Sequence, residues 1–305
     1  MRIGFGLPNI GPLGSAESIA KVAQKAEELG YDTLWTIERL LYPEKPQTPY
    51  PGTPDGSLPE AYKRCLDPLE TLTFAAAHTK KIALGSSILD IPYYHPVMLA
   101  RRLSTLDVFS GGRLRVGFGL GWSEDEFEAT NANRKERGRR ADEFLDVLEK
   151  IWTTDPVEHR GEFFRIPRST IRPKPVQKPH PPIYMAAYAP AALKRIAQKA
   201  KGWNPVGIPV DGMKQMFESL QEMAKAEGRD PASLELVVRA NVEMTERPLG
   251  DARMVFTGSR EQIRSDVEGC RTIGAHEIIF DPTFDPAAQK LDRWLDLLEQ
   301  IEKWV

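Results

Sequence analysis

Residues 97–119 read "VMLARRLSTLDVFSGGRLRVGFG" and hold one complete helix-to-strand unit. Apolar residues at helical spacing run from Val97 to Phe109, "SGG" ends the helix, and "RLRVGFG" (113–119) follows as a mostly apolar strand. Strands that are apolar along their whole length are typical of parallel sheets covered by helices. The stretch therefore predicts a strand joined to parallel neighbours through helices.

The same alternation recurs along the chain and forms eight strand–helix units. The expected strands are residues 2–7, 31–35, 81–89, 113–119, 182–187, 202–206, 234–242 and 276–280. The expected helices are residues 19–29, 69–78, 97–109, 139–152, 190–200, 213–228, 259–274 and 285–304. Gly30 ends the first helix, and Ser259 with Gln262 forms a capping box for the seventh. Eight units predict an α/β fold, a (β/α)8 TIM barrel, and an open doubly wound sheet is the alternative. No domain boundary is visible, so residues 1–305 are expected to form a single domain.

Two inserts interrupt this alternation of strands and helices, after the second and the fourth strand. Residues 37–66, here called the lid segment, hold six prolines and three tyrosines. Long irregular segments that leave a strand are commonly lids or binding loops, although a surface excursion without a role is the alternative. The second insert, residues 153–181, contains a hairpin in "VEHRGEFFRIP" and then an extended proline-rich run. We expect that run to return the chain to the other end of the barrel.

Composition excludes several function classes. The net charge of -2 is too small for a nucleic-acid or membrane-surface partner, both of which need a basic excess. No apolar run reaches membrane-spanning length, and the N-terminus lacks a signal-peptide core. The two cysteines lie far apart, and the five histidines are scattered. These features predict a cytoplasmic protein without a metal site.

Three glycines stand at alternate positions in "VGFGLGWSEDEF" (116–127). The spacing G-x-G-x-G differs from the G-x-G-x-x-G of dinucleotide-binding loops, and the acids that follow would repel a pyrophosphate. Ser123 and Glu126 fit a capping box that would begin a helix there. Because alternate strand residues face one side, Gly117, Gly119 and Gly121 leave one face bare, either for a flat ring in the lumen or for close helix packing.

The run "HPVMLARRLSTLDVFSGGRLRVGFGLGWSEDEFEA" (95–129) resembles the luciferase-like superfamily of flavin and deazaflavin enzymes. The likeness extends over "LGYDTLWTIERL" (29–40), "RGRRADEFLDVLEKIW" (137–152) and residues 173–205, and so covers nearly the whole chain. Within the family the chain is most similar to the coenzyme F-420-dependent oxidoreductases. The resemblance implies a (β/α)8 barrel with inserts, and homodimers are common in the family.

The resemblance also implies where a cofactor ring would lie. In the family the ring rests inside the carboxyl-terminal mouth, backed by a non-prolyl cis peptide that corresponds to Ser87–Ile88. Gly119, Gly121 and Trp122 would line the ring, and Ser86 would hydrogen-bond its edge. The glycines would then clear space for the ring.

A phosphate is expected on a later loop, against backbone amides at a helix start. Ala186, Ala187 and Tyr188 precede the helix at Pro190, although many relatives carry glycines in place of the two alanines. Trp203 and Asn204 follow on the next strand and would wall the cofactor tail, with core packing as the alternative for Trp203.

Glu38 and Arg39 are the candidate catalytic residues, because they leave the barrel mouth at the start of the lid segment. Arg39 would stabilise an oxyanion or bind an acidic substrate, and Glu38 would relay a proton. A surface ion pair between the two is the alternative. Many relatives carry a histidine where Arg39 stands, and its absence here puts alcohol dehydrogenase chemistry in doubt.

Five further basic or histidine positions are weaker candidates. His95 precedes the third helix and is expected to cap it, whereas Arg137, Arg139, Arg140 and Lys201 would form a basic rim for an acidic cofactor tail.

The resulting prediction is an oxidoreductase that moves hydride between coenzyme F-420 and a small organic substrate. An FMN-dependent monooxygenase is the first alternative, and a non-enzymatic flavin-binding barrel is the second. A basic rim around the mouth would favour F-420, whose tail is long and acidic.

Overall fold

The computed structural model describes residues 1–303, and the expected helix residue Trp304 lies outside them. Within this range eight parallel strands close into a barrel, so the predicted (β/α)8 fold is confirmed. They are β1 (Arg2–Gly6), β2 (Thr33–Thr36), β3 (Ala83–Ser86), β5 (Leu114–Gly119), β8 (Ile183–Met185), β9 (Gly202–Trp203), β10 (Glu235–Asn241) and β13 (Glu277–Asp281). The pairing of β3 with β5 closes the ring.

The third expected strand is divided in two. A cis peptide bond joins Ser87 to Ile88, at the position that the resemblance implied, and β4 (Leu89–Asp90) follows. β4 pairs with the end of β5, so that Asp90 lies beside Gly119. The chain therefore passes residues 86–90 directly along the top of the glycine-rich strand.

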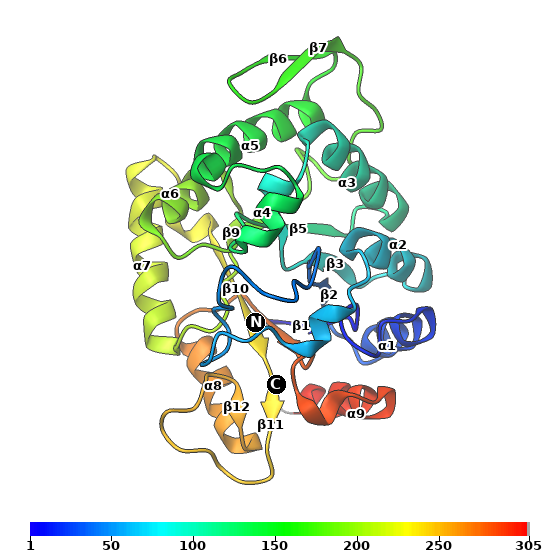
Figure 1. Cartoon of the computed structure of the whole chain (residues 1–305), viewed down its shortest axis with the longest axis vertical. Coiled ribbons are helices and arrows are strands. Elements are labelled where there is room, and N and C mark those ends of the chain that lie inside the picture. Colours follow the sequence, from blue (N-terminus) through cyan, green and yellow to red (C-terminus); the bar gives the residue numbers. More distant parts are fainter. Residues whose placement is uncertain (304–305) are drawn as a thin grey trace.

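Helices surround the barrel in a ring (Figure 1). They are α1 (Ala16–Glu28), α2 (Pro68–His78), α3 (Pro96–Ser110), α5 (Arg137–Thr153), α6 (Pro190–Lys199), α7 (Val210–Ala226), α8 (Arg260–Thr272) and α9 (Leu291–Glu302). The capping box of Ser259 and Gln262 is confirmed. The expected start of the last helix at Asp285 is wrong, because Asp285 caps the short 3-10 helix Pro286–Ala288 and α9 begins at Leu291.

Both expected inserts are present, together with two short additions. The lid segment leaves β2 and contains the 3-10 helix Glu60–Lys63, and the hairpin of β6 (Val157–Arg160) and β7 (Arg165–Ser169) follows α5. α4 (Glu124–Ala129) follows β5, and residues 243–258 carry the small pair β11 (Glu243–Met244) and β12 (Thr257–Gly258). The lid segment and α4 lie on the near face of the barrel in Figure 1, which is its carboxyl-terminal mouth.

A polar network closes the lumen at its amino-terminal end. The buried Glu277 carboxylate accepts hydrogen bonds from Thr33 and from the Trp35 indole, and it pairs with Arg2 and Arg115. Above this network Trp35, Tyr184, Val237 and Ile279 pack together as a layer of their own. Side chains therefore fill the lumen up to the level of Trp35, and only its carboxyl-terminal end is left for a functional site.

The outer surface carries exposed apolar side chains on two neighbouring helices, Phe74 on α2 and Met98, Val108 and Phe109 on α3. The expected homodimer stays a prediction, and no helix within residues 1–303 is long and apolar enough to cross a membrane.

Candidate active site

The glycine face of β5 points into the lumen. Arg115, on that face, reaches Glu277 in the lumen, whereas Phe118, on the other face, packs edge-on against Phe144 of α5. Of the two explanations for the alternating glycines, packing against helices is therefore wrong. The neighbouring strand takes the space instead, because a methyl group at Gly117 would overlap the Ser86 carbonyl oxygen. At Gly119 it would overlap Ile88 and come within 2.5 Å of the Asp90 carboxylate.

Ser86 and Ser87 bond to the protein at the top of the lumen. The buried Ser86 hydroxyl accepts from the Gly117 amide at 3.0 Å and donates to the Gly117 carbonyl at 3.1 Å. Both hydrogen bonds are made within the protein, and the expected bond from Ser86 to a cofactor edge stays a prediction. The Ser87 hydroxyl donates to the Asn204 side chain at 2.7 Å, and Asn204 in turn donates to the Val237 carbonyl. Asn204 is thus brought to the cis peptide, and its expected place along the cofactor tail stays a prediction.

A buried ion pair that the sequence analysis missed forms the floor of the mouth. Arg239 donates to the Asp281 carboxylate and to the Ser87 carbonyl, both at 2.8 Å, and to the Asn241 side chain at 3.0 Å. A methyl group at Gly6 would stand 2.7 Å from the Asp281 carboxyl carbon. The only sequence signal for this pair is a lone arginine in the apolar run "LELVVRANV" (234–242).

Glu38 is half-buried at the rim beside Asp90. One of its carboxyl oxygens accepts from the Asp90 amide at 2.8 Å, and the other accepts a short hydrogen bond from the Tyr94 hydroxyl. The Asp90 carboxylate accepts from the Gly121 amide at 2.7 Å. Burial, with a smaller contribution from Asp90, raises the pKa of Glu38 to about 8, and burial raises the pKa of Asp90 to about 7. These two carboxyls are suited to hold or move a proton near neutral pH.

The raised pKa of Glu38 predicts a pH dependence of stability. A carboxyl whose pKa is higher in the folded than in the unfolded protein stabilises the fold at low pH, and that contribution is lost as the pH rises. For Glu38 the loss runs from about 4.5, its ordinary pKa, to about 8. We expect Glu38→Gln to flatten this part of the profile in urea unfolding between pH 5 and pH 8.5. Glu44→Gln on the exposed lid surface is the control, and a parallel slope in both variants would contradict the prediction.

Arg39 does not pair with Glu38, so the surface ion pair considered from the sequence is wrong. Its guanidinium bonds Glu126 of α4 through two nitrogens, at 2.6 and 2.5 Å, and the two side chains are only 5% and 3% exposed. The same guanidinium lies over the rings of Trp122 and Tyr62, at 4.8 and 5.5 Å. The expected capping box at α4 is also wrong, because Ser123 makes no side-chain cap and Glu126 bonds Arg39 instead.

The lid segment lies over the mouth through an apolar cluster. Its members are Ile10, Ile37, Leu58 and Tyr62, with Tyr42, Tyr50, Ala61, Cys65, Trp122 and Phe284 packed against them. Tyr50 contacts Trp122 and Tyr62, and Tyr62 contacts Phe284, with ring centroids 5.4 to 5.6 Å apart. Hydrogen bonds between Gln47 and the α4 acids Asp125 and Glu128 hold the segment at its outer edge. The segment therefore covers the mouth, and its movement as a lid stays a prediction.

The residues of the expected phosphate loop differ in what their backbone amides can bond. The Ala186 amide donates to Phe118 within the sheet at 2.9 Å, so its expected role as an anion donor is wrong. Ala187 and Tyr188 lead into α6, where a phosphate would meet backbone amides, and their role stays a prediction. Trp203 is wholly buried and donates its indole N–H to the Ala187 carbonyl at 2.9 Å, so core packing is the correct interpretation.

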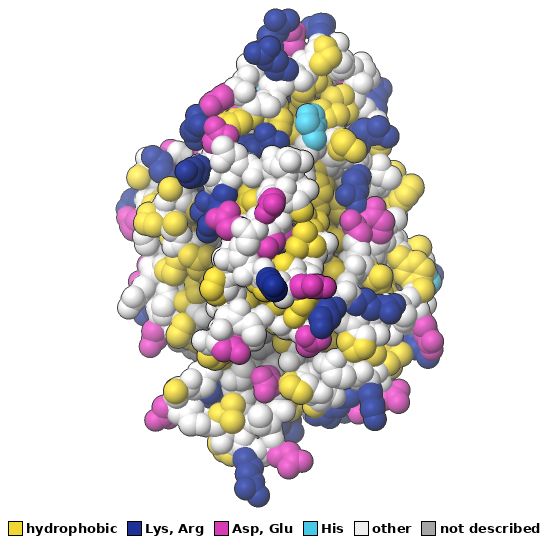
Figure 2. Space-filling model, in the orientation of Figure 1, with side chains coloured by type: hydrophobic (Ala, Val, Ile, Leu, Met, Phe, Trp, Pro, Cys, Tyr) yellow, Lys and Arg dark blue, Asp and Glu magenta, His cyan; other side chains and the backbone are white. Residues whose placement is uncertain are grey.

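The rim is less basic than expected. Arg139 pairs with Glu136 and Glu162, and Arg134 pairs with Glu124 of α4. Lys201 lies at the amino-terminal end of the barrel beside Glu235. Arg137 donates to a backbone carbonyl, and Arg140 lies over the Phe164 ring. In Figure 2 positive and negative side chains are interspersed over the face that carries the mouth.

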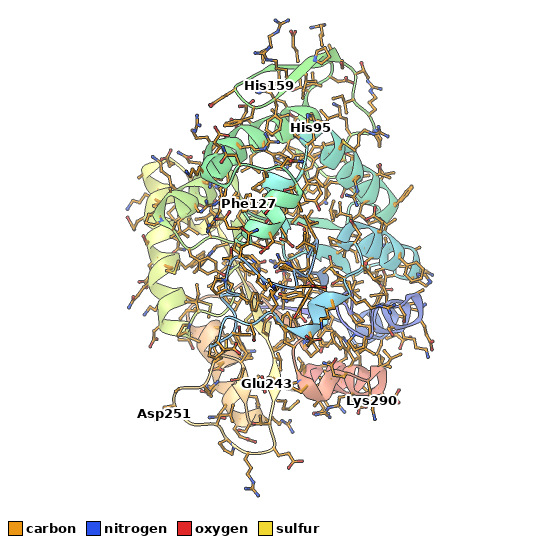
Figure 3. All side chains as sticks on the ribbon, viewed as in Figure 1. His95, Phe127, His159, Glu243, Asp251 and Lys290 are labelled. Carbon is orange, nitrogen blue, oxygen red and sulfur yellow. The ribbon has the colours of Figure 1, made fainter. Side chains whose placement is uncertain are left out.

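His95 begins α3 as expected and accepts from the Val97 amide at 3.3 Å. Burial, and then the Arg140 charge, lower its pKa. Figure 3 labels His95 above Phe127 of α4, at the edge of the mouth.

Two buried hydroxyl groups near the mouth make no hydrogen bond within residues 1–303. The Tyr93 hydroxyl stands 2.5 Å from where a methyl group at Gly121 would lie, and Thr283 follows β13 next to Phe284. Buried polar groups are nearly always paired, so each of these hydroxyls is a candidate ligand contact. No group of three or more metal-ligating side chains is found in this described range.

Residues 4–277 match the profile of the luciferase-like monooxygenase family. An uncharacterised protein of Mycobacterium tuberculosis is 36% identical over 216 residues, which cover 69% of this chain and 75% of that protein. The FMNH(2)-dependent dimethylsulfone monooxygenase of Pseudomonas putida is 34% identical over 155 residues, or 50% of this chain and 42% of that protein.

Solved structures share the fold at lower identity. The monooxygenase RslO1 from Streptomyces bottropensis superposes with a TM-score of 0.81 at 23% identity, over 100% of this chain and 98% of that chain. The coenzyme F420 dependent tetrahydromethanopterin reductase from Methanopyrus kandleri superposes with a TM-score of 0.76 at 17% identity, over 100% and 99% of the two chains.

Proposed function

Because this chain belongs to the luciferase-like monooxygenase family, we propose that it is a monooxygenase that uses reduced FMN, held at the carboxyl-terminal mouth of the barrel. The observation that carries the proposal is the charge of the rim. α4 sets two acids, Asp125 and Glu128, beside the mouth that bond the uncharged Gln47, whereas its other acids, Glu124 and Glu126, are neutralised by Arg134 and Arg39. Arg139 is paired with Glu136 and Glu162, so these arginines do not make the rim basic. Such a rim suits the single phosphate of FMN better than the long acidic tail of F-420. The relative from Pseudomonas putida supports the same cofactor.

The residues at the mouth fit such a cofactor. The buried hydroxyl of Tyr93 is unpaired within the described chain, and it can donate to a ring oxygen or nitrogen. The amides of Ala187 and Tyr188 face a helix start, where a phosphate is stabilised by the helix dipole. Reduced FMN, when bound, supplies the electrons that reduce dioxygen, so that one oxygen atom enters the substrate and the other becomes water.

The chain's own residues have three tasks in this proposal. The floor of Arg239, Asp281 and Asn204 holds residues 87–88 in place under the ring. Glu38 and Asp90 hold protons at the rim, where their raised pKa values allow exchange near neutral pH. The lid segment excludes water, because its aromatic side chains close over the mouth.

An F-420-dependent oxidoreductase is the second candidate. Arg140 favours it, because its guanidinium is without a paired carboxylate and its Nε makes no hydrogen bond within residues 1–303. Together with Arg137 it offers a second anion contact on the rim. The non-enzymatic barrel is not retained, because the relative and the solved structures named above with a stated activity are enzymes.

Cofactor titration tests the choice. We expect FMN to bind at least about tenfold more tightly than F-420, because the acids of α4 repel the F-420 tail. Quenching of flavin and deazaflavin fluorescence measures both affinities on the same protein sample. Tighter binding of F-420, weakened by salt and by Arg140→Gln, would replace the first candidate by the second.

A further inference from the structure

The mouth contains two cations near the lid tyrosines, and both are neutralised. Arg39 and Arg239 lie close enough to influence the Tyr62 hydroxyl. Arg39 is bound through two nitrogens to Glu126, and Arg239 is bound to Asp281. Neither guanidinium is therefore available as the receptor of an acidic substrate that the sequence suggested for Arg39.

Further carboxyls make the site unfavourable for anions. Glu38 and Asp90 lie at the same rim, and their hydrogen-bond partners are backbone amides and a tyrosine instead of a cation. With pKa values raised to about 8 and about 7, these two carboxyls are largely or half protonated at pH 7 and supply no positive charge. An anionic group that entered the mouth would lose its hydration and would find no free counter-charge. The electrostatics of the mouth thus work against acidic substrates.

The underside of the lid segment offers flat apolar surface. Tyr50, Tyr62, Trp122 and Phe284 contact one another in a chain of rings, with Ile10 and Leu58 beside them. Aromatic rings of this kind also attract cations, but here the Arg39 guanidinium already lies over Trp122 and Tyr62. The remaining ring surface is suited to an uncharged flat group.

One buried polar group adjoins these rings in the chain. Thr283 directly precedes Phe284, and its buried hydroxyl has no hydrogen-bond partner within residues 1–303. A hydroxyl in this position can bond one carbonyl or hydroxyl oxygen of a bound molecule.

We propose, resting on the oxidoreductase function above, that the substrate is an uncharged molecule with a flat apolar ring and one oxygen substituent, bound between the lid rings and the barrel mouth. In this proposal Glu126 is the specificity-determining residue, because its pairing with Arg39 keeps anionic substrates out.

Three probes with one ring system and different charge test the proposal: 2-naphthol, 2-naphthoate and 2-naphthylmethylamine. Calorimetry at pH 7 measures their binding to the full chain, with and without FMN. We expect 2-naphthol to bind at least about tenfold more tightly than 2-naphthoate, because only the anion would lose its hydration without gaining a counter-charge. Equal or tighter binding of the anion, or tightest binding of the cationic amine, would overturn the proposal.

Two variants identify the residues responsible. Glu126→Gln frees Arg39 and is expected to shift the preference toward 2-naphthoate by about tenfold, measured at a temperature where circular dichroism shows the variant folded. Glu44→Gln, which removes an exposed acid of the lid segment, is the control and should leave the preference unchanged. Thr283→Val should weaken 2-naphthol several-fold, and Thr283→Ser should restore it.

An unchanged preference in Glu126→Gln would show that Glu126 does not set the charge specificity. The affinities of the three probes test the substrate class, whereas the cofactor titration tests the choice between FMN and F-420. A protein that binds F-420 instead of FMN, yet prefers 2-naphthol, would contradict the proposed function while supporting the substrate class.

Discussion

Gly117→Ala is expected to lower the free energy of unfolding by about 3 kcal/mol or more, because the added methyl group has no space. It would overlap the Ser86 backbone carbonyl, and backbone atoms cannot turn away as a side chain can. Moving the two strands apart to relieve that overlap would also weaken the two hydrogen bonds between the Ser86 hydroxyl and the Gly117 backbone. Urea unfolding followed by circular dichroism measures the loss as a lower transition midpoint.

Two other glycines provide matched comparisons for this substitution. At Gly119 the nearest obstacles are the side chains of Ile88 and Asp90, which can move, so Gly119→Ala should cost less than Gly117→Ala. At Gly138, in the first turn of α5, the nearest atom is 3.6 Å away, and alanine should stabilise the helix by up to about 1 kcal/mol. If Gly117→Ala and Gly138→Ala proved equally stable, the close contact between β5 and residues 86–88 would be wrong.

The second large effect is expected at the floor of the mouth. Arg239→Met should destabilise the protein by about 3 to 5 kcal/mol, because it leaves the Asp281 carboxylate buried without its counter-charge. The Ser87 carbonyl would lose its donor at the same time, so residues 87–88 would be held less firmly. Urea unfolding measures the stability, and the cofactor titration described above measures the consequence for binding.

A double variant separates the two causes of this loss. Asp281→Asn keeps the acceptor for the Thr283 amide and removes the charge. Combined with Arg239→Met, it should recover at least half of the stability, because an uncharged pair leaves no isolated ion in the core. A double variant as unstable as the sum of the single ones would assign the effect to packing instead of charge.

The repeating pattern of the chain was sufficient to predict the barrel. Each strand and helix leaves its signature within a short window: the apolar run at 113–119, the helical spacing at 97–109 and the capping box at Ser259 are examples. Counting eight such units predicted the closed sheet that β3 and β5 complete. The same local patterns gave wrong predictions at two cap motifs. Asp285 caps a short 3-10 helix instead of the last helix, and Ser123 makes no side-chain cap because its expected partner Glu126 bonds Arg39.

The candidate site was predictable only in its location. Sequence order put Glu38 and Arg39 at the end of a strand, hence at the mouth, but it did not indicate what each would bond. Glu126 lies 87 residues from Arg39, and it reads from the sequence as part of a helix cap. In the structure Glu126 bonds the Arg39 guanidinium, which the sequence alone leaves available for a substrate.

By itself, then, the sequence determined the alternation of strands and helices, the two inserts and the strand ends at which functional groups gather, because these depend on neighbours within a few residues. Only the tertiary structure decided which charges cancel, since Arg39 with Glu126 and Arg239 with Asp281 meet through closure of the barrel and not through spacing along the chain. It also decided what the glycines of β5 accommodate. Their bare face is contacted by the adjacent strand, because the pairing of β4 with β5 brings Ile88 and Asp90 against it.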